Sequence, residues 1–260
     1  MTPVLLEGLA EGQEQSWLGL LGVSTVLPGD WCLVGGQMVY LLCRERSFAP
    51  ARLTNDGDVV LDVRARPKVL HDFTAALLSV GFGPAGESPE GHQHRWVRDK
   101  ATIDVLIPHG VGKVAASRRG VTGGTTLQSP GAQQAIARAG PVAVQVGTTT
   151  GTVRRPNLLG ALVVKAAAYS VANDPARDRH LVDFAVLAAI ARRADRIAEQ
   201  LTPRDLRYLL PALASLSRSR RLWAGVEGAD RALLALGQIV AARSGRRSKS
   251  SSPEPPTVDL

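Results

Sequence analysis

The sequence predicts an α+β protein, in which a mixed sheet with flanking helices precedes an all-helical domain. Strand-like and helix-like segments alternate along the first part of the chain, and no convincing strand follows Pro156. Of the 260 residues, 45% are hydrophobic, which is enough to bury a substantial core. We therefore expect an α/β domain at 1–155, a helical domain at 156–245 and a disordered tail at 246–260, where apolar residues are scarce.

The elements of the first domain are bounded by turn and cap residues. Pro28-Gly29 ends an apolar helix, Gly35-Gly36 ends a buried strand and opens a helix, and Pro67 and Gly81 bracket another helix. The Asp99-Lys100 turn makes its two flanking strands neighbours. The expected elements, in chain order, are helices 5–11 and 15–27, strand 31–36, helix 36–46, strand 59–63, helix 67–82, strands 94–98 and 102–108, helix 129–140, and strands 141–146 and 151–155.

The second domain shows apolar residues at helical spacing throughout. The expected helices are 157–172, 179–201, 203–216 and 230–244. The spacing of apolar residues thus changes at residue 155, from strands mixed with helices to helices alone, and this change also supports the predicted fold class.

Composition excludes several classes of protein. No stretch approaches the roughly 20 apolar residues of a membrane span, and the N-terminus lacks the basic region of a secretory signal. Cys32 and Cys43 are too few for a disulfide framework, and we expect both to be reduced core residues. The sequence has no cluster of Cys and His residues of the kind that binds zinc, so we do not expect a zinc site. We expect a cytoplasmic protein without a membrane partner.

The chain carries 31 Lys and Arg against 23 Asp and Glu, a formal net charge of +8. This excess permits a polyanionic partner such as RNA. Many of the arginines are clustered, however, and a solvated arginine-rich surface explains them equally well.

The stretch ARLTNDGDVVLDV, residues 51–63, has two interpretations. Read locally, Asp-Gly between alternating runs is typical of a hairpin turn. Read as chemistry, Asp56 and Asp58 lie one residue apart at the start of a strand, so both side chains point to the same face of a sheet. The local residues leave both interpretations open.

Asp104 favours the second interpretation. It lies inside the apolar strand ATIDVLIP, and a buried carboxylate without a partner costs several kcal/mol. No Lys or Arg lies on the same strand. Three carboxylates that converge at one sheet edge repel one another, and a hard divalent cation such as Mg²⁺ or Mn²⁺ would hold them together. Such ions activate a hydroxyl and neutralise a triphosphate in phosphoryl transfer.

A strand that ends in Gly35-Gly36, then R-x-T-x-D-x-D over Arg52–Asp58, then Asp104 on a third strand resembles the nucleotidyltransferases of the DNA polymerase β type. Together with the helical Lys165 and a later helical Asp183, it resembles the AbiEii-type toxins of type IV toxin–antitoxin systems. The resemblance runs from about residue 30 to 190.

The resemblance implies a set of roles. Gly35, Gly36 and Thr54 would bind the nucleotide, with glycine N–H groups close to the phosphates. The metal site would consist of Asp56, Asp58 and Asp104, which are also catalytic. Asp104 would act as, or support, the base for the acceptor hydroxyl.

Lys165 would neutralise phosphate charge, although an exposed helix lysine is the alternative. Asp183 would be catalytic, paired with Lys165 or the nucleotide, or would instead form a surface cap or ion pair. The sequence departs from the family at Gly57, which replaces a large apolar residue, and at His180, which replaces the first aspartate of K-D-x-x-D-L.

Three arginines have two interpretations each. Arg95, in HRWVR, either reaches phosphates or keeps an edge strand soluble. Arg154 and Arg155 either line a cleft for RNA or are solvated.

By resemblance, the expected function is Mg²⁺-dependent transfer of a nucleotide from an NTP to a hydroxyl acceptor. The acceptor would be RNA, in particular the 3′ end of tRNA, and the protein a toxin opposed by an antitoxin. A protein or antibiotic hydroxyl as acceptor, or a degenerate domain that binds a nucleotide without catalysis, remain alternatives.

Overall fold

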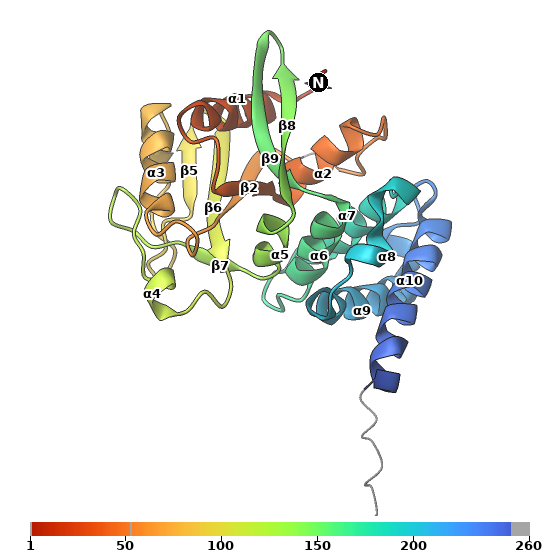
Figure 1. Cartoon of the computed structure of the whole chain (residues 1–260). Coiled ribbons are helices and arrows are strands. Elements are labelled where there is room, and N and C mark those ends of the chain that lie inside the picture. Colours follow the sequence, from red (N-terminus) through yellow and green to blue (C-terminus); the bar gives the residue numbers. More distant parts are fainter. Residues whose placement is uncertain (1, 53, 251–260) are drawn as a thin grey trace, which may run out of the picture.

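The computed structural model describes residues 2–52 and 54–250, and side chains up to residue 245. It contains two sheets and a helical C-terminal part (Figure 1). The strands are β1 (Val4–Leu6), β2 (Trp31–Val34), β3 (Asp56–Leu61), β4 (Gly83–Pro84), β5 (Arg95–Arg98), β6 (Ala101–Pro108), β7 (Leu127–Ser129), β8 (Ala139–Val146) and β9 (Thr149–Pro156). The helices before β9 are α1 (Glu11–Val26), α2 (Gly35–Arg44), α3 (Val69–Ser79), α4 (Lys113–Ala116) and α5 (Ala132–Ile136).

The C-terminal part is helical, as predicted. Its elements are α6 (Leu158–Tyr169), α7 (Asp178–Ala189), the 3-10 helix η1 (Arg193–Asp195), α8 (Ile197–Gln200), α9 (Pro203–Arg218), the 3-10 helix η2 (Arg220–Leu222) and α10 (Ala229–Ser250). A capping box at Thr202 and Asp205 starts α9. The predicted fold class, a mixed sheet with flanking helices followed by helices, is confirmed.

The larger sheet is mixed and carries the residues of interest. Its strand order is β2-β3-β6-β5-β4, and β7 also pairs with β6. β3 runs parallel to β6 and β7 runs parallel to β6, whereas β2–β3 and β5–β6 are antiparallel. The smaller sheet has the order β1-β8-β9, and β8–β9 forms the long hairpin that rises above α1 in Figure 1.

Helices cover the two faces of the larger sheet differently. α1 packs on β3 and β6 and contacts α3, and Trp31 of β2 meets Phe73 of α3 edge-to-face. α2 and α5 also contact β3, and both of these helices contact α6. Gly57 is buried towards α1, because a Cβ there would lie 3.2 Å from Leu20 Cδ1. Asp56 and Asp58, its neighbours in β3, therefore point to the face away from α1.

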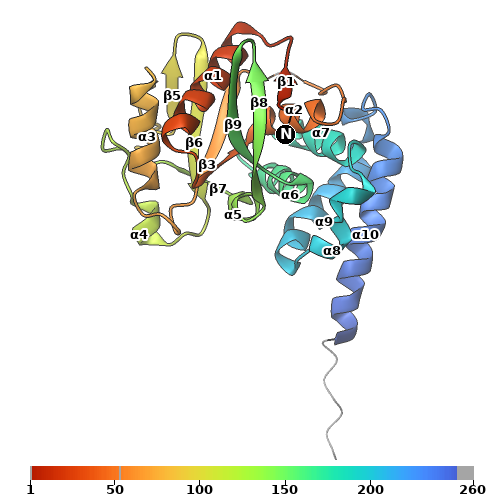
Figure 2. The ribbon, with the colours of Figure 1, turned by 45° about the horizontal axis from the view of Figure 1, so that its top comes forward.

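The helical part is joined to the first part through α6 and α7. α6 contacts α2 and α5, and α7 contacts α2. Figure 2 shows α6 below the β8–β9 hairpin, and α8, α9 and α10 further from the sheets. Among the described helices, none is long and apolar enough to cross a membrane.

The hairpin interpretation of residues 51–63 is wrong. β3 starts at Asp56 and continues through Gly57 and Asp58 as a strand paired with β2 and β6. α2 and the segment after it separate β2 from β3 in the chain. Asp-Gly therefore lies inside a strand here, and the glycine makes room for α1.

The predicted helix at 5–11 is also wrong. Val4–Leu6 is strand β1, which pairs in parallel with β8 through Val4↔Val144 and Leu6↔Val146. Periodicity in a short apolar segment does not separate helix from strand, and here a partner far along the chain decides.

Two further expectations about helices need correction. The helix expected at 179–201 ends at Ala189 and is followed by η1 and α8. Arg196, with a left-handed φ of 49°, separates η1 from α8. α10 extends to Ser250, so residues 246–250, which we expected to belong to a disordered tail, are helical. The rest of the expected tail, residues 251–260, lies outside the described part of the chain.

Candidate active site

Four residues, one on each of four adjacent strands, form a row across the larger sheet. Val34 is paired with Asp58, Asp58 with Asp104, and Asp104 with Arg95, on β2, β3, β6 and β5 in turn. Asp56 lies one step earlier on the same face, opposite Thr102. The register therefore places the three aspartates predicted from the sequence at one place on the sheet. We call Asp56, Asp58 and Asp104 the carboxylate group.

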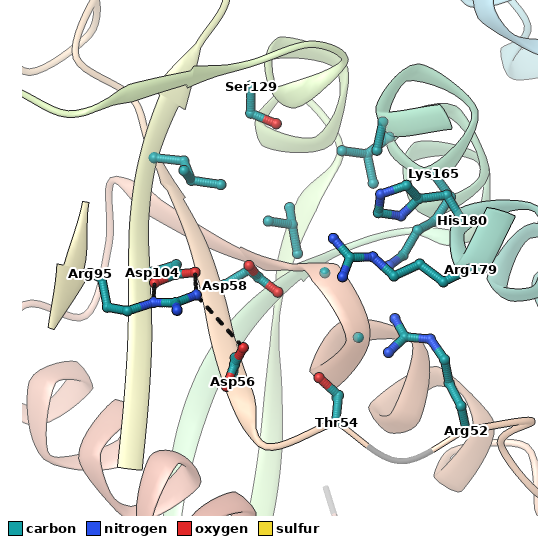
Figure 3. A pocket seen from close by; sticks show the side chains of 16 residues that line it. Arg52, Thr54, Asp56, Asp58, Arg95, Asp104, Ser129, Lys165, Arg179 and His180 are labelled. Carbon is teal, nitrogen blue, oxygen red and sulfur yellow. Dashed lines mark hydrogen bonds and ion pairs between the residues drawn. The ribbon is translucent and has the colours of Figure 1, made fainter. Parts of the chain in front are cut away.

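A cavity of about 250 Å³ lies in front of the carboxylate group. Figure 3 shows the carboxylates on its sheet side and Arg52, Lys165 and Arg179 on the opposite side, from the segment before β3 and from α6 and α7. We call these three the cationic wall. The residues that line the cavity are Val34, Gly35, Gly36, Arg52, Thr54, Asp56, Asp58, Arg95, Asp104, Leu106, Ser129, Val164, Lys165, Ala168, Arg179 and His180.

The glycine pair opens α2 directly against the carboxylate group. Gly35 has a φ of 66°, which disfavours residues with a Cβ, and a Cβ there would lie 1.7 Å from Asp58 Oδ2. A Cβ on Gly36 would lie 2.5 Å from Thr54 Cγ2. The two glycines therefore let the first turn of the helix, with its unpaired N–H groups, approach the cavity closely.

Asp58 is the carboxylate that lacks a partner. Among the described residues, no side chain or backbone group donates a hydrogen bond to it or forms an ion pair with it. Burial, and then the charge of Asp104, raise the pKa of Asp58 from 3.8 to about 6. The charges of Lys165 and Arg179 act in the opposite direction but do not outweigh these effects.

Asp104, by contrast, has a partner. Arg95 Nε donates to Asp104 Oδ1 at 2.9 Å, and Arg95 Nη2 donates to Oδ2 at 2.8 Å. The same Nη2 lies 3.9 Å from Asp56 Oδ2. The edge-strand interpretation of Arg95 is therefore wrong, because β5 lies between β6 and β4. The missing partner of Asp104 comes from the neighbouring strand.

Asp183 ties two members of the cationic wall together. Lys165 Nζ lies 2.7 Å from Asp183 Oδ2, and Arg52 Nε and Nη2 lie 3.0 and 2.7 Å from its two oxygens. Burial raises the pKa of Asp183, but the charges of Lys165 and Arg52 outweigh it and hold this pKa below its usual value. Lys165 is buried, so it is not the exposed helix lysine of the alternative interpretation. Asp183 itself does not line the cavity.

His180 contributes an uncharged ring to the same side. Its Nε2 lies 3.1 Å from Asp174 Oδ2, whereas its buried Nδ1 has no hydrogen-bond partner among the described residues. Burial, with the charges of Lys165 and Arg179, lowers the pKa of His180 to about 4. At neutral pH His180 is therefore neutral and adds no charge to the cavity.

The donors of the carboxylate group suit a hard divalent cation. Three carboxylates face one cavity, and the unpartnered Asp58 would gain most from a cation beside it. In the part of the chain that the structure describes, no three His, Cys, Asp or Glu side chains are arranged to hold a metal ion as they stand. Arg95 takes both oxygens of Asp104, which leaves Asp56 and Asp58 as the accessible oxygen donors.

The structure brings most of the predicted site residues together. Gly35, Gly36, Thr54, Lys165 and the carboxylate group all line the cavity. Arg154 and Arg155 do not: Arg155 pairs with Glu45, and Arg154 donates to the Ala139 carbonyl.

Three polar residues that line the cavity have no role in the prediction from sequence: Arg52, Arg179 and Ser129. Arg52 belongs to the R-x-T motif and Arg179 precedes His180, so the sequence did contain a signal for these two. Ser129, at the end of β7, had no such signal because β7 is only three residues long and was not expected.

Comparison with known proteins supports the fold and nothing finer. No protein-family model matches the sequence, and no curated protein matches it. Among solved structures, the chain is similar to an antigenic nucleotidyltransferase-like protein from Paracoccidioides brasiliensis, with a TM-score of 0.50 and 17% identity over 87% of this chain and 94% of the other. A structure of the antibiotic-resistance factor ANT(2'')-Ia matches with a TM-score of 0.36 and 11% identity over 91% and 97%. The first of these likenesses shows that the chain has a nucleotidyltransferase-like fold.

Proposed function

We propose that this protein is a metal-dependent nucleotidyltransferase, which moves a nucleotide from an NTP to a hydroxyl acceptor. One observation carries the proposal: the carboxylate group faces the cationic wall across a cavity that the glycine pair opens. A triphosphate needs positive charge and N–H donors, whereas the metal and the acceptor hydroxyl need carboxylates. The two requirements are met on opposite sides of one cavity.

The phosphate side consists of Lys165, Arg52 and the start of α2. Asp183 holds Lys165 and Arg52 in fixed positions, so neither cation must be ordered when a triphosphate binds. Gly35 and Gly36 would offer backbone N–H groups to the phosphates, with Thr54 beside them. This side binds and orients the nucleotide.

The carboxylate side would hold Mg²⁺ or Mn²⁺ on Asp56 and Asp58, with Asp104 completing the group. The bound ion would neutralise charge on the transferred phosphoryl group and favour the deprotonated acceptor. Asp104 lies beside Asp58 on the neighbouring strand, where it would accept or orient the proton of the acceptor hydroxyl. Gly57 does not disturb this arrangement, because a side chain at this position would point towards α1 and away from the carboxylate group.

We further propose RNA, and the 3′ end of tRNA in particular, as the acceptor, with the protein acting as a toxin opposed by a cognate antitoxin. The net charge of +8 favours a polyanion. The cavity itself is lined by four cationic side chains and three carboxylates, and its histidine is neutral. That balance disfavours a polycationic antibiotic as the acceptor.

The test is a transfer assay with the full chain, Mg²⁺ and each α-labelled NTP in turn. Total tRNA, the protein alone and an aminoglycoside serve as three separate acceptors. Label in tRNA supports the RNA acceptor, and label in protein or aminoglycoside contradicts it while supporting nucleotidyl transfer. If none of the NTPs labels any of the three acceptors, the proposed activity is contradicted.

Matched variants locate the activity in the cavity. Asp58→Asn removes a charge from the carboxylate group and should lower the rate by at least about a thousandfold. Asp99→Asn is the control, because Asp99 is exposed in the β5–β6 turn at a positive φ that Asn tolerates. A wild-type rate in Asp58→Asn would show that the site lies elsewhere.

A further inference from the structure

Arg95 already supplies positive charge at the place where a metal is expected. It is the direct cross-strand neighbour of Asp104, and its guanidinium donates to both oxygens of that carboxylate. The Asp104 side chain is only 12% exposed, whereas the Arg95 side chain is 47% exposed, so the carboxylate is buried and the guanidinium covers it from the solvent side. The same guanidinium lies 3.9 Å from Asp56. Arg95 therefore offsets part of the charge that would otherwise attract a cation.

The positive charges around this cavity disfavour the binding of a free divalent cation. Beside Arg95, the lining includes the three positive charges of the cationic wall. A free ion must either displace Arg95 from its bidentate pair with Asp104 or bind to Asp56 and Asp58 alone. Both routes lower its affinity, because cations already present repel it at short range.

A cation that arrives on a triphosphate meets a different balance. The phosphates bring their own oxygen ligands to the metal, and their negative charge faces Lys165 and Arg52. The repulsion that the free ion experiences becomes an attraction for the complex, and Arg95 need not move.

We propose that Arg95 makes the site selective for a divalent cation already bound to a nucleoside triphosphate over the free cation. This inference rests on the proposed function and assigns to Arg95 a positioning role: it sets which form of the metal the carboxylate group accepts. It acts through Asp104 and needs no contact with the reacting atoms.

The test measures the binding of Mn²⁺ to the full chain without nucleotide, by titration calorimetry and by the electron paramagnetic resonance signal of free Mn²⁺. Wild type should bind weakly. Arg95→Gln should bind free Mn²⁺ at least about tenfold more tightly, since one positive charge beside the carboxylates is gone. With a nonhydrolysable α,β-methylene NTP analogue present, the two proteins should bind the Mn²⁺ complex within about threefold of each other.

Two controls separate charge from general damage. Arg95→Lys keeps the positive charge and should retain the weak binding of wild type. Lys100→Gln removes an exposed cation from the turn of the same hairpin, three residue pairs away, and should change nothing. Tight free Mn²⁺ binding in Arg95→Lys would overturn the role of the charge.

The outcomes also distinguish this inference from the proposed function. Equal affinity for free Mn²⁺ in wild type and Arg95→Gln overturns the inference but leaves the metal site standing. Absence of Mn²⁺ binding in every variant, with and without the analogue, overturns the inference and the proposed metal site together.

A second measurement needs only the wild-type fold, in case Arg95→Gln destabilises the chain. The nitrogen-15 NMR signal of Arg95 Nε–H, assigned by its absence from Arg95→Lys, reports on the pair with Asp104. Free Mg²⁺ should leave this signal unchanged. A shift of the signal with free Mg²⁺ alone would overturn the inference.

Discussion

Asp58 lines the cavity, whereas Asp183 lies behind the cationic wall on the other side, and the surroundings of the two carboxylates are opposite in kind. Asp183 accepts from Lys165 and from two nitrogens of Arg52, and its pKa is lowered. Asp58 has no donor among the described residues, and its pKa is raised to about 6. Asp183 is therefore satisfied by the fold, whereas Asp58 is left for something that the fold does not supply.

The comparison teaches how to separate a positioning carboxylate from a binding carboxylate. A chain tolerates an unpaired buried charge at a cost of several kcal/mol, and such a cost is expected where a ligand offsets it. Asp183 is buried and Asp58 is half-buried. The sharper difference is the presence or absence of hydrogen-bond donors, and the following predictions test that distinction.

The largest expected effect is on stability, from Asp183→Asn. Lys165 is only 2% exposed, and this change leaves its charge buried without a carboxylate. The free energy of unfolding should fall by about 3–5 kcal/mol, as in other broken buried pairs, measured by urea unfolding at pH 7.

Asp58→Asn is the matched control for that change. It removes a carboxylate that repels Asp104 and has no partner to lose, so the midpoint of thermal unfolding should stay the same or rise. If both variants lose stability equally, the distinction between the two carboxylates is wrong.

A smaller effect is expected for Gly35→Ala, which tests how closely α2 approaches Asp58. The added Cβ would meet Asp58 Oδ2 at 1.7 Å and would adopt a φ of 66°. We expect a loss of about 1–3 kcal/mol in the free energy of unfolding, from strain and displacement of the carboxylate. Gly29→Ala is the control, because Gly29 has no atom within 4 Å of its Cβ position. Equal effects of the two changes would contradict the close approach.

Arg52→Gln should cost less than Asp183→Asn. Arg52 is 30% exposed, and Lys165 remains to neutralise Asp183 after the change. The expected loss is about 1–2 kcal/mol in urea unfolding, typical of hydrogen bonds to a charged group that retains another partner. A loss as large as that of Asp183→Asn would show that Lys165 alone cannot compensate the carboxylate.

The sequence predicted the carboxylate side of the cavity better than the cationic side. Asp56 and Asp58 share a face because side chains alternate along a strand, and Asp104 could be added because an apolar strand rarely holds a lone charge. The partner of Asp104 lies on the strand that the Asp99-Lys100 turn places beside it, and the register of this hairpin sets Arg95 directly opposite Asp104. Arg52 and Asp183 meet across 131 residues, a contact that no local pattern encodes.

The same limit applies to the fold. Helices with a clear apolar face, such as α3 and the capped α9, are predicted from the pattern. β1 was missed because its partner strand β8 lies about 140 residues further on. The helix predicted at 179–201 ends at Ala189, and just beyond it Arg46 donates to the Ile190 carbonyl and binds Asp195 from 149 residues away. Local propensity gives way wherever a distant partner decides.

The smallest effect expected at neutral pH concerns His180, beside the satisfied carboxylate. Its folded pKa of about 4 lies below the ordinary 6.5, so between these pH values the unfolded chain binds a proton that the folded chain does not. The free energy of unfolding should therefore fall as the pH is lowered from 6.5 to 4, and the contribution of His180 should be fully present above pH 6.5. His180→Gln, which cannot titrate, should weaken this dependence in unfolding curves at pH 7 and pH 5, with little change at pH 7 beyond the loss of the Asp174 contact. An unchanged pH dependence in that variant would mean that the ring is protonated in the fold, and the side of the cavity around Asp183 would then carry one positive charge more than the comparison with Asp58 assumes.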